Sequence, residues 1–281
     1  MTTKESVEIK IPVIAVIGSN QSGKTTTVVD LVKELVKRGY KVGTAKHIPE
    51  TDFTIDTKNK DTWRHGKAGA IVVSSVAPKE IAVIRKIETA KLGLGNILSF
   101  IDENEVDVIV IEGFKSLIKT EKSIPKIITA KTREEAVDIA KQFSNVLAVV
   151  GVFPFKGKIM GIPYINAKKS MDLEDVVQKI IPLIKIMHAF RQLPNLNCGD
   201  CGFQNCIGLA KAVADGKATL KNCYTLRGKG VKVQINGEKV PMNQFVQDMI
   251  RGALFGLISP LKKTQIKGNE SVLVTIEKPR K

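Results

Sequence analysis

The chain has 281 residues, of which 43% are hydrophobic and 26% are charged, and its 44 Lys and Arg residues outnumber its 28 Asp and Glu residues. This composition excludes an intrinsically disordered chain, and the apolar run near the amino terminus is too short to span a bilayer. The net charge of +16 favours anionic partners, which include nucleotide phosphates, an acidic protein and nucleic acid. Because no signal peptide begins the sequence, we expect a cytoplasmic protein of about two domains.

The first predicted elements are a strand, a glycine-rich loop and a helix within residues 11–40. An apolar run leads into the pattern G-x-x-x-x-G-K-T, and an amphipathic helical pattern follows it. In such a loop the backbone N–H groups surround nucleotide phosphates, Lys24 neutralises the outer phosphates and Thr25 binds Mg²⁺. The predicted phosphate-binding residues are Gly18, Ser19, Asn20, Gln21, Ser22, Gly23, Lys24, Thr25 and Thr26.

A second strand is predicted over residues 41–46, with Lys46 and His47 at its carboxyl end. A charged loop through Asp56 and Asp61 then leads into a helix. The tip of this strand should lie on the phosphate side of the sheet, so the loop is either a switch that senses the nucleotide or a solvated connection. His47 is open to two interpretations, a structural hydrogen-bonding residue or a catalytic base.

A P-loop also needs an acidic residue at the end of a neighbouring strand. Residues 106–111 are predicted to form a buried parallel strand, and Glu112 follows at its carboxyl end. Open α/β sheets bind ligands at this end of their strands, whereas Asp107 lies at the opposite end. We therefore expect Lys24 and Glu112 to be the catalytic residues, and Glu112 to join Thr25 at the Mg²⁺ ion.

Residues 148–166 are predicted to form the last strands of the sheet. A helix should follow, with Ser170 as its cap and Pro182 as a kink. These elements predict an α/β domain over residues 1–187, in which the mostly parallel sheet of a P-loop NTPase carries helices on both faces.

This set of motifs resembles the MobB family of molybdopterin-guanine dinucleotide biosynthesis proteins. The resemblance covers roughly residues 10–165 and is carried by Gly18 to Thr25, Lys46-His47, Asp56 with Lys60-Asp61, Ala68-Gly69-Ala70, Glu112-Gly113-Phe114-Lys115 and Pro125-Lys126-Ile127. It implies that the protein binds GTP, hydrolyses it weakly, forms a homodimer and assists attachment of a guanine nucleotide to molybdopterin. It also implies that Asp56, Asp61 and Lys115 border the nucleotide site. GTP rather than ATP comes from the resemblance, because the sequence lacks a clear Asn-Lys-x-Asp guanine-binding motif.

The four cysteines of the chain lie close together, at the spacing Cys198-x2-Cys201-x4-Cys206-x16-Cys223. In a reducing cytoplasm such a cluster binds metal or does redox chemistry more often than it forms disulfides. A tight turn directs the first two thiolates at one centre, and Cys206 begins a predicted helix that ends at Gly216. The spacing alone leaves an iron-sulfur cluster, a zinc site and disulfides or idle thiols open.

The stretch from Cys198 to Cys223 resembles the small [4Fe-4S] domain of the corrinoid iron-sulfur protein large subunit and of an Rnf-type electron-transport subunit. The resemblance is carried by the glycines after the first two cysteines, the alanines of the helix and the glycine ahead of the last cysteine. It covers about thirty residues and implies that all four cysteines bind a [4Fe-4S] cluster. Pro182 and Pro194 place the start of this domain near residue 188, so we expect it to span residues 188–228.

Residues 229–281 are predicted to form a small α+β unit. Asn236-Gly237 lies between two alternating runs and predicts a β-hairpin. An amphipathic helix over residues 243–258 and a strand over residues 270–277 should follow. The apolar side chains of this helix are interpreted as core rather than as a partner surface; they are Phe245, Met249, Leu254 and Phe255.

Three functions are consistent with these features. The first is a GTP-binding accessory protein of molybdenum or tungsten pterin cofactor assembly, in which a nucleotide-gated loop repositions a [4Fe-4S] domain or a pathway enzyme. The second is an ATP-driven redox activator or metallochaperone for a client metalloenzyme. The third is zinc-stabilised nucleic-acid binding, which the aromatic content of 5% disfavours.

Overall fold

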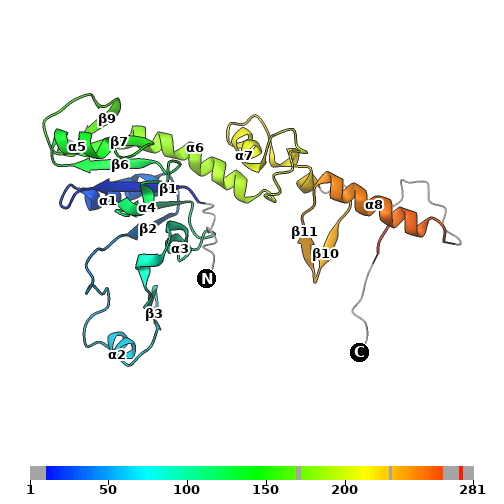
Figure 1. Cartoon of the computed structure of the whole chain (residues 1–281), viewed down its shortest axis with the longest axis horizontal. Coiled ribbons are helices and arrows are strands. Elements are labelled where there is room, and N and C mark those ends of the chain that lie inside the picture. Colours follow the sequence, from blue (N-terminus) through cyan, green and yellow to red (C-terminus); the bar gives the residue numbers. More distant parts are fainter. Residues whose placement is uncertain (1–10, 169–171, 228–229, 262–271, 275–281) are drawn as a thin grey trace. The chain divides into compact units, whose positions relative to one another are not determined.

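The structure is a computed structural model that describes residues 11–168, 172–227, 230–261 and 272–274 (Figure 1). The chain divides into two compact units, Met1–Ile184 and Lys185–Lys281. The cysteine region and the residues after it fall in the same unit, whereas the sequence suggests two parts there. The boundaries at residues 187 and 228 therefore stay predictions.

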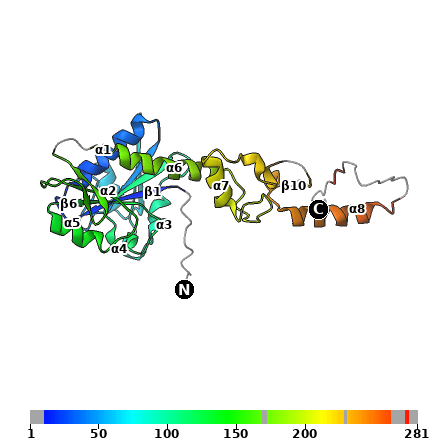
Figure 2. The ribbon, with the colours of Figure 1, turned by 90° about the horizontal axis from the view of Figure 1, so that it is seen from above.

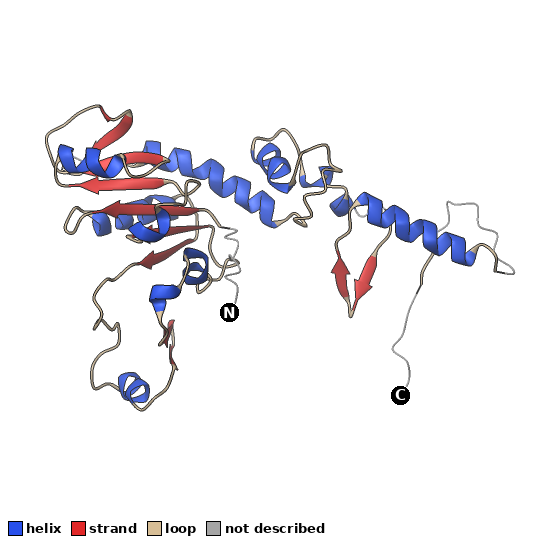
Figure 3. Ribbon diagram, viewed as in Figure 1, coloured by secondary structure: helices blue, strands red, loops and turns tan. Residues whose placement is uncertain are grey.

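The first unit is built on a seven-stranded sheet in the order β2-β5-β1-β6-β7-β9-β8. All neighbouring strands are parallel except β8, which is antiparallel to β9 at the edge (Figure 3). The mostly parallel α/β fold predicted from the sequence is thus confirmed. The strands are β1 (Val13–Gly18), β2 (Val42–Lys46), β5 (Val108–Glu112), β6 (Lys126–Ala130), β7 (Val146–Gly151), β8 (Lys158–Ile159) and β9 (Ile162–Asn166).

Helices cover both faces of this sheet, with α1 and α6 on one side and α4 and α5 on the other (Figure 2). Along β1, Ile14 and Val16 pack with α1 and α6, whereas Ala15 and Ile17 pack with α3, α4 and α5. Successive strand residues point to opposite faces, so one uninterrupted apolar run supplies both layers of the core. The helices are α1 (Lys24–Lys37), α3 (Leu94–Leu98), α4 (Lys115–Ile118), α5 (Arg133–Ala140) and α6 (Glu174–Arg191).

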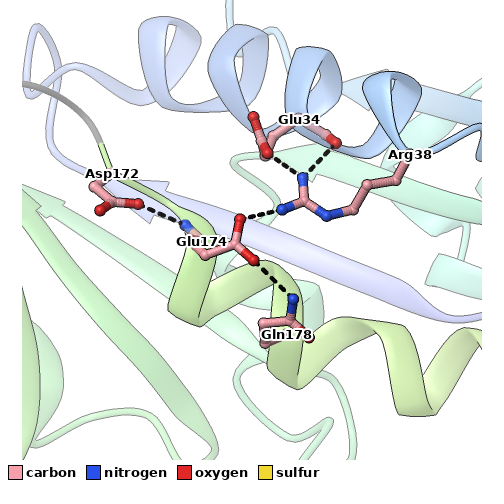
Figure 4. Close-up of polar contacts among 5 residues, drawn as sticks. All are labelled: Glu34, Arg38, Asp172, Glu174 and Gln178. Carbon is pink, nitrogen blue, oxygen red and sulfur yellow. Dashed lines mark hydrogen bonds and ion pairs between the residues drawn. The ribbon is translucent and has the colours of Figure 1, made fainter.

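The end of α1 and the start of α6 are joined by a polar network (Figure 4). The Arg38 guanidinium donates to the carboxylates of Glu34 and Glu174, and Gln178 donates to Glu174 at 2.7 Å. The Asp172 carboxylate accepts from the backbone N–H of Glu174 at 3.0 Å, which satisfies one free N–H at the start of α6. The predicted cap Ser170 lies outside the described residues, and α6 continues on both sides of Pro182.

A separate arm of the first unit carries α2 (Asp61–Lys67) and the antiparallel hairpin of β3 (Val72–Ala77) and β4 (Glu80–Arg85). Its two strands do not belong to the main sheet. The hairpin exposes apolar side chains, among them Val76 at 76% and Ile81 at 69%. The short 3₁₀ turn Thr89–Lys91 then leads back to α3.

The second unit has a small apolar cluster of its own, formed where the end of α6 meets the cysteine region. The hairpin predicted at Asn236-Gly237 is confirmed, and both turn residues have the positive φ that this turn type requires. Within the described parts of the chain, no helix is both long and apolar enough to cross a membrane. The elements are α7 (Cys206–Ala214), η2 (Leu220–Asn222), η3 (Thr225–Arg227), β10 (Val233–Ile235), β11 (Glu238–Val240) and α8 (Gln244–Ile258).

The core interpretation of α8 was wrong. Phe245 is 69% exposed and Met249 is 58% exposed, while Leu254 and Phe255 are only half-buried. The buried residue of α8 is instead Gln247. Helical spacing shows that one side of a helix is apolar, but not what covers that side. Of the predicted strand over residues 270–277, residues 272–274 are not in a strand, and the rest lies outside the described residues.

Candidate functional site

The predicted phosphate loop joins β1 to α1, where Gln21 and Gly23 have positive φ and Lys24 is the first helical residue. The Lys24 ammonium bends back and donates to the carbonyl of Ser19 at 2.5 Å. Ser22 and Thr129 share a hydrogen bond of 2.6 Å, which ties the loop to the end of β6. This loop is therefore a closed turn whose lysine lies over its own backbone.

Gly18 stands where the loop leaves β1, and its lack of a side chain is required by packing. A Cβ atom there would collide with the hydroxyl and carbonyl oxygens of Thr129 and with the hydroxyl of Ser22. The backbone at Gly18 can approach β6 this closely only because glycine has no Cβ.

Glu112 is the acidic residue beside the loop. The Thr25 hydroxyl donates to Glu112 Oε1 at 2.9 Å, and Lys46 Nζ lies 3.5 Å from the same oxygen. Strand register explains the meeting, because Glu112 pairs with Val16 of β1 on one side and with Lys46 of β2 on the other. Glu112 is buried, at 7% exposure for the residue. Its carboxylate has a hydroxyl group and an ammonium group as neighbours. Hydroxyl and carboxylate oxygens are ligands that Mg²⁺ prefers.

Positive charge is concentrated around Lys24. Burial lowers the pKa of Lys24, and the charge of Glu112 opposes this lowering while the charges of Lys115 and Lys46 add to it. Lys115 begins α4, directly after Gly113 and Phe114, which both have positive φ. Three ammonium groups that repel one another favour the binding of a polyanion between them.

Of the other predicted site residues, His47 lies beside Glu112, whereas Asp56 and Asp61 have partners outside the phosphate loop. The His47 ring lies against Phe114, with 5.4 Å between ring centroids, and the His47 N–H donates to the carbonyl of Glu112. Asp56 accepts from Thr62 at 2.8 Å, and Asp61 is 3.9 Å from Arg64. Among the described residues, no hydrogen bond or ion pair joins Asp56 or Asp61 to the phosphate loop. Their part in nucleotide binding stays a prediction.

Glu135 is a site residue that sequence reasoning missed. Burial alone raises the pKa of its carboxyl, but hydrogen bonds with Ser19 of the phosphate loop and with the backbone N–H of Lys131 bring that pKa below its ordinary value. Thr132 caps α5 by accepting from the Glu135 N–H at 3.2 Å. A Thr-x-x-Glu capping box was visible in the sequence and would have placed Glu135 at a helix start beside β6.

Three of the four cysteines lie in or against the small apolar cluster of the second unit. Cys206 and Cys223 are buried in it, Cys201 packs against it, and all four thiols are free. Burial raises the pKa of the Cys198 thiol. Cys206 is the first residue of α7.

Two asparagines hold the cysteine segments in place. Asn197 Oδ1 accepts from the backbone N–H of Cys206 at 3.0 Å, which links the residue before Cys198 to the start of α7. Asn205 Oδ1 accepts from Gly208 N–H at 2.8 Å and caps the same helix. Asn197 therefore ties the chain next to Cys198 to the start of α7, and Asn205 stabilises that start.

Thiols are the ligands that iron-sulfur clusters and structural zinc require, so the chemistry of this donor set fits such a group. Within the described part of the chain, however, no three His, Cys, Asp or Glu side chains lie in an arrangement that could hold a metal ion. Cys201, Cys206 and Cys223 lie in or against one apolar cluster without forming a metal-binding group. Binding a cluster would require the four side chains to converge.

Comparisons with known proteins match both units. A family model described as "MobB: Molybdopterin guanine dinucleotide synthesis protein B" matches residues 13–152, and one described as "Putative Fe-S cluster" matches residues 193–224. A Bacillus subtilis MobB crystal structure, 22% identical, covers 60% of this chain and 98% of its own, with a TM-score of 0.49.

Two curated relatives are molybdopterin-guanine dinucleotide biosynthesis adapter proteins by name. The "Molybdopterin-guanine dinucleotide biosynthesis adapter protein" of Haemophilus influenzae is 30% identical over 148 residues, 52% of this chain and 78% of that protein. The "Putative molybdopterin-guanine dinucleotide biosynthesis adapter protein" of Methanocaldococcus jannaschii is 31% identical over 253 residues, which are 89% of this chain and 92% of that protein. With its phosphate-loop sheet and its added cysteine region, the chain belongs to the MobB family.

Proposed function

We propose that the protein is a nucleotide-dependent adapter in the biosynthesis of molybdopterin guanine dinucleotide, which binds GTP with Mg²⁺ and hydrolyses it slowly. The observation that carries this proposal is the contact between the Thr25 hydroxyl and the buried Glu112 carboxylate beside Lys24. The names of the curated relatives supply the pathway. GTP is taken from the family, since the residues alone do not distinguish it from ATP.

On nucleotide binding, the Lys24 ammonium leaves the Ser19 carbonyl and contacts the outer phosphates. Thr25 and Glu112 separate, and both become available to Mg²⁺ on the phosphate side of β1 and β5. Mg²⁺ supplies charge neutralisation on the phosphate oxygens. Lys46 and Lys115 provide further positive charge for the terminal phosphate.

The same contacts support a switch. Lys46 ends β2, and His47 is bonded to the Glu112 carbonyl, so the start of the following loop is tied to the acidic residue that would face Mg²⁺. Occupancy of the site would pull on Lys46 and His47 and so bias the conformation of residues 48–61. A pathway enzyme that contacts this loop would then bind or dissociate according to which nucleotide is bound.

The second unit is proposed to bind a [4Fe-4S] cluster through Cys198, Cys201, Cys206 and Cys223. The assignment is supported by the free state of all four thiols, by the apolar cluster that includes Cys201, Cys206 and Cys223, and by the family match over residues 193–224. Iron-sulfur centres supply electron transfer or structural cross-linking. Asn197 would keep the Cys198 and Cys206 segments close to each other before the cluster binds.

The protein is further proposed to act as a cytoplasmic homodimer. The β3–β4 hairpin exposes Val76, Ile81 and Val83 on an arm outside the main sheet, and Ile71, just before β3, is exposed as well. An exposed apolar hairpin is an interaction surface or an aggregation liability unless a partner covers it. A second copy of the chain would bury these side chains in a symmetric contact. Light scattering of wild type and of an Ile81→Lys variant tests this, since a monomeric wild type would contradict it.

Titration calorimetry with GTP and with ATP, in the presence of Mg²⁺, tests the nucleotide assignment. We expect GTP to bind wild type and Lys24→Ala to lose binding. Lys33→Ala is the matched control, because Lys33 lies on the same helix with its side chain 72% exposed and paired with Asp30. Unchanged affinity in Lys24→Ala would contradict the phosphate site. Binding of ATP but not GTP would favour the redox activator of a client metalloenzyme instead.

Anaerobic purification tests the cluster. We expect a brown protein with about four irons per chain, whose optical and EPR spectra change on reduction with dithionite. A colourless protein that holds one zinc would exclude the redox function and leave the nucleotide-dependent adapter intact.

A further inference from the structure

A small cavity lies in the second unit, next to the last cysteine in the sequence. Its volume is about 190 Å³, and its walls are formed by Tyr224, Gly230, Val231, Gln247, Asp248 and Arg251. Three of these residues come from the first two turns of α8, and Tyr224 directly follows Cys223. None of the motifs predicted from the sequence accounts for this cavity.

Gln247 is the buried polar residue of the cavity, at 5% exposure. Its Nε2 donates to the carbonyl of Met242 at 3.0 Å, which fixes the orientation of the amide and leaves Oε1 for the cavity. Oε1 is buried and has no hydrogen-bond partner among the described residues. A buried acceptor without a donor is costly in a folded protein, so its presence in a cavity wall indicates that a ligand supplies the donor.

Gly230 is what keeps this acceptor accessible from the cavity. A Cβ atom at Gly230 would collide with Gln247 Oε1 and would lie 3.9 Å from the Tyr224 hydroxyl. Its φ of +110° is also one that glycine adopts readily and other residues rarely adopt. The space in front of the Gln247 amide therefore depends on the backbone conformation of Gly230 and on its lack of a side chain.

The chemistry of the walls restricts the ligand. Gln247 Oε1 and the adjacent Asp248 carboxylate are acceptors, Arg251 is a permanent cation, and Tyr224 offers an aromatic ring. The complementary molecule has neighbouring N–H donors, a flat ring and an anionic substituent. A 2-amino-4-oxo-pyrimidine edge with a phosphate has all three, and both pterins and guanine carry that edge.

We propose that this cavity binds the 2-amino-4-oxo-pyrimidine edge of a phosphorylated pterin or guanine compound. Gln247 and Asp248 accept from the N–H groups of the edge, and Arg251 contacts the phosphate. The ligand class rests on the proposed function, because both rings occur in molybdopterin guanine dinucleotide. The cavity is smaller than the roughly 300–1,000 Å³ that encloses a whole ligand of that size, so it takes one ring system only.

The test uses the full-length chain with Lys24→Ala, which silences the phosphate loop, and two probes, 6-hydroxymethylpterin and guanosine 5′-monophosphate. We expect at least one probe to bind in calorimetry or fluorescence titration. Gln247→Met should weaken binding about tenfold or more, since it removes the acceptor at nearly constant volume. Gln244→Met on the same helix is the control, because its side chain is exposed and lies outside the cavity wall.

Additional measurements distinguish the two ligands and allow for a variant that does not fold. Binding of only the pterin or only the guanine probe identifies the source, and either result supports the proposal. Arg251→Ala should weaken the phosphate-bearing probe and leave 6-hydroxymethylpterin unchanged. Asp248→Asn, an exposed position, replaces Gln247→Met if that variant does not fold.

Three results would overturn the proposal. They are the absence of binding by both probes, equal binding of adenosine 5′-monophosphate, and full competition by inorganic phosphate alone. None of these results bears on the proposal that the phosphate loop binds GTP, because GTP binding is measured with the wild-type chain and the cavity is tested in Lys24→Ala. Conversely, if wild type failed to bind GTP, the proposed nucleotide assignment would be wrong, and the result of the cavity test would be unaffected.

Discussion

The two units differ in what holds them together. In the first, strand residues such as Ile14 and Ile17 are fully buried in two apolar layers on opposite faces of one sheet. In the second, the apolar cluster has seven buried residues, and two of them are the cysteines Cys206 and Cys223. An apolar cluster this small buries little surface, so a metal held by the thiols would add to the stability of this unit. The first unit is thus specified by its apolar pattern, whereas we expect the second to depend on what its thiols bind.

The largest expected effect is the loss of the second unit on iron removal. Chelation of the purified protein, or a Cys223→Ser substitution, should abolish protection of the α7 amides in hydrogen exchange, because metal binding and folding are coupled in such small units. The β1 amides should keep their protection. Persistent protection of α7 without iron would show that the apolar cluster suffices by itself.

Matched core truncations come next. Ile14→Ala should destabilise the first unit by about 2–5 kcal/mol in urea unfolding, because it leaves a cavity in a layer that cannot collapse. Leu209→Ala removes a similarly buried side chain from the second unit. It should lower the iron content of purified protein without changing GTP affinity. If either variant lost iron content and GTP affinity to the same extent, the two units would not fold separately.

The pH dependence of nucleotide binding should belong to the first unit alone. Burial lowers the pKa of Lys24 in the free protein, and bound phosphates favour its charged form. Affinity for GTP should therefore be constant well below that pKa and fall as pH rises through it, by at most about tenfold per pH unit. Calorimetry over this range should show a flat profile in Lys24→Arg, since Arg stays charged. A flat profile in wild type would contradict the assignment.

The smallest expected effect concerns helix caps. Thr132 caps α5 in the first unit and Asn205 caps α7 in the second. Replacing either with Ala should cost about 1 kcal/mol. Thermal melts should show little change for Thr132→Ala, whereas Asn205→Ala should speed iron loss to a chelator. Identical chelation rates in Asn205→Ala and wild type would show that the cap does not limit the second unit.

Features with a strict local rule could be predicted from the sequence. The phosphate loop follows from glycine and lysine spacing, and the position of Glu112 follows from a buried strand whose carboxyl end meets that of β1. The contact of Lys46 with Glu112 needed strand order as well, because it depends on β2 pairing with β5 rather than with another strand.

Features set by long-range packing could not be read in this way. Periodicity marks the apolar side of α8 but gives no information on its neighbours, so Phe245 was placed in a core where it is exposed. Gln247 is the buried residue of the same helix, and the spacing of the apolar residues gives no indication of this. Asp56 and Asp61 lie on an arm whose course depends on an independent hairpin, which charge patterning alone cannot locate.

The collision that a side chain at Gly18 would cause bears on how homologous sequences are compared. Gly18 is required by its close approach to the hydroxyl and main-chain oxygens of Thr129 in β6 and to the hydroxyl of Ser22, whether or not a phosphate is bound. A descendant that has lost nucleotide binding would therefore still retain glycine at this position while Lys24 drifts. Lys24, and not Gly18, therefore distinguishes homologues that bind nucleotide from homologues that have lost this function.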